Sequence, residues 1–122
     1  MIQDLVTKIK KQIPKSGLAS DEVIESLKKM RVYAMQDENP KLTKTIRLTY
    51  EHLENEKGFF IAIPADEVIE TEEDVLDNHT LNSGSQEDQN ESFLFLLDLM
   101  ADYKRPTSVQ DIEAYKQALL LF

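Results

Sequence analysis

Few side chains in this sequence could support acid–base or metal chemistry, and His52 is the first candidate. His52 precedes Glu56 by four residues, so on a helix the two side chains would lie one turn apart and could offer two ligands to a metal ion. A zinc site needs at least a third protein ligand, and the HExxH motif is absent. We therefore interpret His52 as a surface histidine of a helix. A small metal-dependent enzyme that uses His52 with neighbouring acids is kept as an alternative.

The other common catalytic patterns are missing. The chain has no cysteine, which excludes thiolate metal sites and thiol nucleophiles. Its three glycines are too isolated to form a phosphate-binding loop, and the acids of 66–77 lack the ligand spacing of an EF-hand. His79 stands in a polar segment that would not hold a catalytic base in place. We predict a protein that is not an enzyme and that has neither a cofactor nor a metal site.

Charge is distributed unevenly along the chain. Residues 1–57 carry 11 Lys and Arg against 9 Asp and Glu, a net +2, whereas residues 58–122 carry 3 against 14, a net −11. No basic residue occurs between Lys57 and Lys104. The acidic half, residues 58–122, would repel nucleic acid and attract a basic protein. A DNA-binding helical protein that uses Lys41, Lys44 and Arg47 is therefore only an alternative.

Apolar residues at helical spacing predict a mainly α fold, a single-domain bundle of about five helices over 1–122. The first helix should end at Pro14 and Gly17, and the second should run from about 21 to 36. A third helix should begin at Pro40 and stop at Gly58, forming an antiparallel hairpin with the second. Together these make a helical part over 1–57. The last two helices should form a hairpin over 92–122, and the first of them should end before Pro106.

Two segments between the helices are not helical in pattern. Residues 59–63, Phe-Phe-Ile-Ala-Ile, predict an apolar extended strip or short β element, within an extended stretch over 59–70. The sequence leaves open whether this strip is a strand, part of the core or part of an interface. Residues 71–91 are polar and acidic, and we interpret them as a flexible linker.

These features favour a cytoplasmic protein–protein interaction module, in a narrower version an acidic inhibitor of a basic partner. The lack of cysteine fits a reducing compartment, and no apolar run approaches the roughly 20 residues that span a membrane. A homo-oligomer is left open. The candidate partner-binding residues are the apolar anchors and the acids near them: Phe59, Phe60, Ile61, Glu70, Glu72, Glu73, Asp74 and Asp77.

Overall fold

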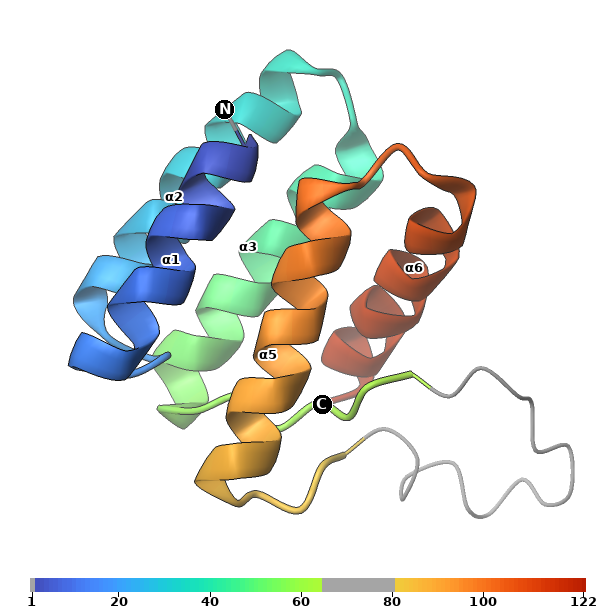
Figure 1. Cartoon of the computed structure of the whole chain (residues 1–122). Coiled ribbons are helices and arrows are strands. Elements are labelled where there is room, and N and C mark those ends of the chain that lie inside the picture. The colour runs from blue at the N-terminus through green and yellow to red at the C-terminus, as the bar shows by residue number, and fades with distance from the viewer. Residues whose placement is uncertain (1, 65–80) are drawn as a thin grey trace, which may run out of the picture.

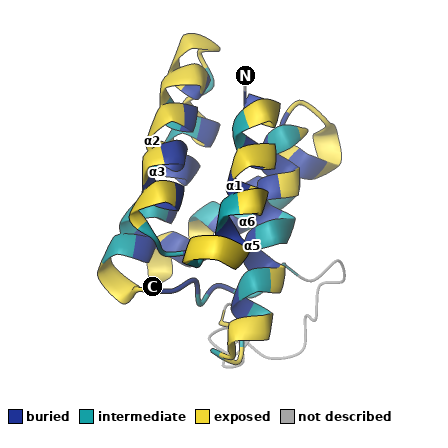
Figure 2. Cartoon of the chain, turned by 60° about the vertical axis from the view of Figure 1, so that its left-hand side comes forward, coloured by how far each residue is buried: buried dark blue, intermediate teal, exposed yellow. Residues whose placement is uncertain are grey.

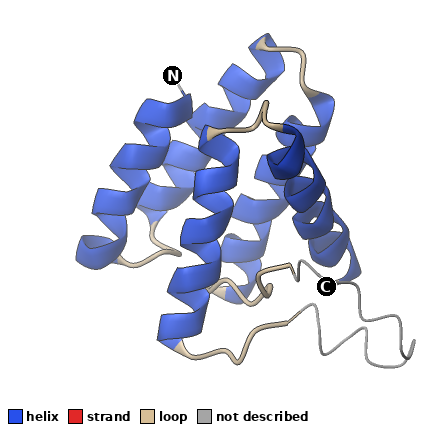
Figure 3. Cartoon of the chain, turned by 45° about the vertical axis from the view of Figure 1, so that its right-hand side comes forward, coloured by secondary structure: helices blue, strands red, loops and turns tan. Residues whose placement is uncertain are grey.

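The computed structural model describes residues 2–64 and 81–122 and confirms the mainly α fold. Its helices are α1 (Ile2–Ser16), α2 (Asp21–Gln36), α3 (Pro40–Glu56), α5 (Gln86–Ala101) and α6 (Pro106–Leu121) (Figure 1). The described residues contain helices and loops but no strand (Figure 3). None of the helices in this part of the chain is long and apolar enough to cross a membrane.

Local capping explains where the first three helices begin and end. The Ser20 hydroxyl accepts a hydrogen bond from the Val23 N–H at 3.3 Å, and the Asn39 side chain accepts one from the Leu42 N–H at 3.1 Å. Each bond satisfies an N–H that the helix itself leaves unpaired. Pro40 follows Asn39 in the first turn, as predicted. The α2–α3 turn is therefore tight, and the two helices pack side by side (Figure 1).

Two helix boundaries differ slightly from prediction. Helix α1 continues through Pro14 to Ser16, and Gly17, with φ of 92°, ends it. A proline near the end of a helix leaves only one carbonyl without its usual bond, so the helix tolerates it. Helix α6 begins at Pro106 rather than after it, because proline fits the first helical position.

The predicted linker extended too far toward the C-terminus. Residues 86–91 are the first turns of α5, and the Ser85 hydroxyl caps them by accepting a hydrogen bond from the Asp88 N–H at 3.1 Å. Leu81 forms an isolated antiparallel bridge with Ile61. The C-terminal hairpin thus begins at 86 instead of 92. Acids in the first turn of a helix, here Glu87 and Asp88, stabilise its dipole, and this is why an acidic composition did not prevent a helix. Residues 71–80 of the predicted linker lie outside the described residues.

One core runs through the whole bundle. Each helix buries one face and exposes the other (Figure 2). Helix α5 packs against both α1 and α6, while α3 packs against α2 and α6. The α5 side chains Phe93, Leu96, Leu97 and Met100 are fully buried. At about 25 cal/mol per Å² of apolar surface, such burial is the main favourable contribution to folding.

Candidate functional site

Polar side chains from two helices, α3 and α5, converge on the strip that follows α3. The Gln89 side-chain oxygen Oε1 accepts a hydrogen bond from the Phe59 N–H at 3.1 Å, and His52 Nε2 accepts one from the Phe60 N–H at 3.1 Å. The Ser92 hydroxyl donates to the Ile61 carbonyl at 2.6 Å. These bonds give the strip the partners that a neighbouring strand would supply in a sheet.

Asn82 completes the pairing from the other side. Its side-chain amide donates to the carbonyls of Phe59 and Ile61 at 3.0 and 3.2 Å, and its backbone N–H donates to the Phe60 carbonyl at 2.9 Å. A single asparagine therefore satisfies three carbonyls. The strip is held as an extended segment, consistent with the prediction, and most of its hydrogen bonds run to side chains.

The strip belongs to the core more than to the surface. The Phe59 and Ile61 side chains are 0% and 1% exposed, and Phe60 is half-buried. The Phe59 ring lies 5.4 Å from that of Phe93 and 6.1 Å from that of Tyr115, between centroids. Of the possibilities that the sequence left open for this strip, the side chains of Phe59 and Ile61 thus belong to the core of the chain. Glu70, Glu72, Glu73, Asp74 and Asp77 lie outside the described residues.

His52 is a buried residue, which corrects its interpretation as a surface histidine. It is 6% exposed, and its ring packs edge-on against Phe59 and Phe122 at 5.6 and 4.5 Å between centroids. Burial lowers its pKa from 6.5 to about 4, so the imidazole is neutral near pH 7. With Nε2 engaged by the Phe60 N–H, this nitrogen is not free to bind a metal. Among the described residues, no group of three His, Cys, Asp or Glu side chains could hold a metal ion.

Gln89, Ser92 and Tyr115 were not identified from the sequence. All three are buried, and the Tyr115 hydroxyl donates to the Ser92 carbonyl at 3.0 Å and lies 3.0 Å from the Ser92 hydroxyl. Burial raises the pKa of Tyr115, which keeps it protonated. The Ser92 hydroxyl is fully engaged with the Ile61 carbonyl and Tyr115, so it is not poised as a nucleophile. The arrangement therefore holds the backbone of the strip in place.

A sequence signal for two of these residues did exist, since Gln89 and Ser92 precede Phe93 and Leu96 at helical spacing on the apolar face of the helix.

Gly58 is expected to tolerate no side chain. A Cβ there would lie 2.5 Å from the Gln89 side-chain oxygen and 2.9 Å from the Phe60 ring. That oxygen cannot move without losing its hydrogen bond from the Phe59 N–H. The Gln89 side-chain amide also donates a hydrogen bond to the Gly84 carbonyl at 2.8 Å. We predict that Gly58→Ala lowers the free energy of unfolding by about 1–3 kcal/mol. Urea denaturation measures the change.

A matched variant distinguishes this clash from a general effect of introducing alanine near the end of α3. Asn55→Ala, on the exposed last turn of α3, should change stability by less than about 0.5 kcal/mol. If Gly58→Ala unfolds at the same urea concentration as the wild type, the position of Gln89 is not as fixed as its hydrogen bonds indicate.

Exposed apolar side chains gather near the strip, at the end of α6. We call Ile63, Leu81, Leu120, Leu121 and Phe122 the terminal apolar surface; their exposed fractions run from 37% to 76%. The end of α6 lies beside the strip (Figure 1), and the contact of Phe122 with His52 joins the two. In the sequence, Ile63 and Leu81 stand on either side of the acidic residues 66–77.

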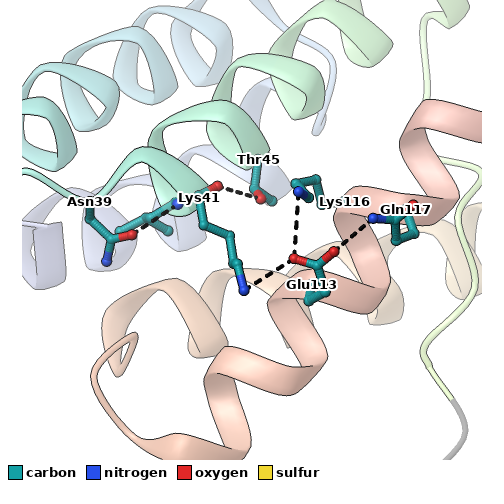
Figure 4. A network of polar contacts seen from close by, with 7 residues as sticks. Asn39, Lys41, Thr45, Glu113, Lys116 and Gln117 are labelled. Carbon is teal, nitrogen blue, oxygen red and sulfur yellow. Dashed lines mark hydrogen bonds and ion pairs between the residues drawn. The ribbon is translucent and has the colours of Figure 1, made fainter.

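The basic residues of α3 have divided roles. Lys41 forms an ion pair with Glu113 of α6 at 3.3 Å and so links the two helices (Figure 4). A hydrogen bond from Gln117, with help from Lys41 and Lys116, holds the pKa of Glu113 below its usual value. Arg47 pairs with Glu51 at 3.5 Å. Lys41 is thus exposed, and its ammonium group is already paired with a carboxylate of α6.

The chain matches no protein-family model, and comparison with curated proteins and with solved structures likewise gives no match. The class that the fold defines is a helical bundle in which side chains of α3 and α5 clamp an extended strip, and Tyr115 of α6 packs near its Phe59 ring.

Proposed function

We propose that this protein is a cytoplasmic protein–protein interaction module that binds a basic partner protein. The observation that supports this most is the terminal apolar surface, where Leu120, Leu121 and Phe122 are 48%, 76% and 51% exposed. Clusters of exposed large apolar side chains on a folded protein commonly mark interaction sites. With Phe59 buried, these residues replace the strip as the apolar anchor.

The charge next to this surface indicates the kind of partner. Residues 65–80 contain seven Asp and Glu and no Lys or Arg. A partner that brings Lys and Arg to this end of the bundle would meet complementary charge around an apolar centre, the usual composition of an interface. In this proposal the acids speed association, and Leu121 with Phe122 slow dissociation. An acidic inhibitor that covers a basic site is the narrower form.

The experiment compares variants of the full chain by affinity purification from the native cytoplasm, followed by binding kinetics with the protein recovered. The acidic variant replaces Glu70, Glu72, Glu73, Asp74 and Asp77 by their amides. It should associate roughly tenfold more slowly at low salt, and the difference should shrink as salt shortens the Debye length from about 10 Å at 0.1 M to about 3 Å at 1 M. Leu121→Ser should mainly raise the dissociation rate.

The control carries the same change of charge elsewhere. It replaces five exposed acids on the helices and the α2–α3 turn by their amides: Glu25, Glu38, Glu56, Glu87 and Glu91. Its association rate should stay closer to that of the wild type, because these acids are divided among three helices and a turn and are not concentrated in one segment. If both amide variants bind a recovered protein at the native rate and Leu121→Ser dissociates normally, the proposed interaction site is wrong.

A further inference from the structure

A groove with a basic lining lies between the C-terminal half of α2 and the N-terminal half of α3. Its volume is about 580 Å³, and its walls carry the cations Arg31, Lys44 and Arg47 together with Met35, Pro40 and the single carboxylate of Glu38. Residues 40, 43, 44 and 47 of α3 follow the spacing of one helix face. The groove lies toward the α2–α3 turn, at the opposite end of the bundle from the strip (Figure 1).

The three cations are little used by the rest of the protein. Arg31 Nε is buried, yet it has no hydrogen-bond partner among the described residues. Lys44 is exposed and makes no ion pair within this part of the chain. Arg47 pairs only with Glu51, and both side chains are about 40% exposed, so that pair contributes little. An unsatisfied buried Arg N–H carries a cost that a bound acceptor would remove.

We infer that this groove binds a small phosphomonoester that also carries an apolar group. A phosphate presents three acceptor oxygens and about two negative charges, which suits an Arg fork flanked by Lys44 and Arg47. The start of α3 adds the positive end of a helix dipole. Met35, which is 52% exposed, and Pro40 offer an apolar contact beside the cations.

Size and charge favour a small molecule over an acidic protein. The groove falls within the roughly 300–1,000 Å³ of small-molecule sites. The whole chain carries a net charge of −9, which repels a large acidic surface at long range. A small phosphomonoester places its charge directly between the cations and avoids most of this repulsion. The site is separate from the proposed protein interaction and does not depend on it.

The test is an NMR titration of the full chain with phenyl phosphate and with inorganic phosphate. We expect saturable shifts confined to amides of residues 31–47, with phenyl phosphate binding several-fold more tightly because of Met35. Arg31→Lys keeps the charge but loses the fork and the Nε donor, and it should weaken phenyl phosphate binding about tenfold. Lys44→Gln, at an exposed position, should weaken binding and leave the fold intact.

A matched control removes a positive charge outside the groove. Lys11→Gln, exposed on α1, should bind phenyl phosphate as the wild type does. The proposal fails if the shifts do not saturate at millimolar ligand, or if Lys11→Gln weakens binding as much as Lys44→Gln. It also fails if Arg31→Lys, once shown to be folded, binds normally. A phosphoserine peptide that binds more tightly than phenyl phosphate would overturn the small-molecule assignment.

Discussion

Phe59→Ala is expected to lower the free energy of unfolding by about 3–5 kcal/mol, a large part of the stability of a domain of this size. Phe59 is 0% exposed, and its ring packs against Phe93, Tyr115 and His52. These neighbours come from α5, α6 and α3. The cavity left by alanine would therefore open where three helices meet and could collapse only partly. Guanidinium denaturation followed by circular dichroism measures the loss.

Leu121→Ala is the control for this experiment. It removes a large apolar side chain that is 76% exposed, and it should change stability by less than about 0.5 kcal/mol. A Phe59→Ala variant that loses less than about 1 kcal/mol would mean that the strip is not part of the core. Binding of the recovered partner, per folded molecule, should be unaffected by Phe59→Ala, since the ring is buried.

Acid should destabilise the fold through His52, by about 3 kcal/mol in total. Its pKa falls from 6.5 to about 4 on folding because burial disfavours the imidazolium. The unfolded chain thus binds a proton more readily than the folded chain between these two values. The contribution of His52 to the free energy of unfolding is unchanged above about pH 6.5. It decreases as the pH drops from there, and the decrease is complete below about pH 4.

The measurement is the free energy of unfolding of the wild type and of His52→Gln at several pH values from 7 to 4. Gln at this position carries an acceptor but does not titrate. The stability of the wild type relative to the variant should therefore decrease as the pH falls, whatever its value at pH 7. A constant difference across this range would show that the pKa of His52 is the same in the folded and the unfolded chain, as for a histidine exposed to solvent.

The helices could be predicted from the sequence because their signals are local. The side chains of Ser20 and Asn39 each cap a helix by accepting a hydrogen bond from the N–H three residues further along the chain, and Pro40 suits the first turn of a helix. Apolar spacing then identified the buried face. The start of α5 was missed because residues 86–91 are polar, and composition was taken as evidence of a linker. Ser85 as a cap, followed by Glu87 and Asp88, was the signal to read instead.

The clamp around the strip could not be predicted in the same way, because its contacts are distant in sequence. The bond between Ser92 and Ile61 joins residues 31 apart, and that between Gln89 and Phe59 joins residues 30 apart. Nothing near His52 marks it as buried, since Glu51 and Glu56 flank it and its neighbours Phe59 and Phe122 arrive from elsewhere. The burial of Phe59 and Ile61 could be recognised only when the positions of α5 and α6 were known.

The clamp also bears on aggregation. A five-residue run of Phe, Ile and Ala with no charge is the type of segment that stacks into intermolecular cross-β structure when its backbone is free. In the native state side chains from α3 and α5, together with Asn82, occupy the N–H groups of Phe59 and Phe60 and the carbonyls of residues 59–61, so this part of the strip offers no open edge to another chain. Protection therefore lasts as long as α5 stays docked. Detachment of α5, which supplies Gln89 and Ser92, or protonation of His52, which accepts from the Phe60 N–H, would free this backbone for pairing with another chain.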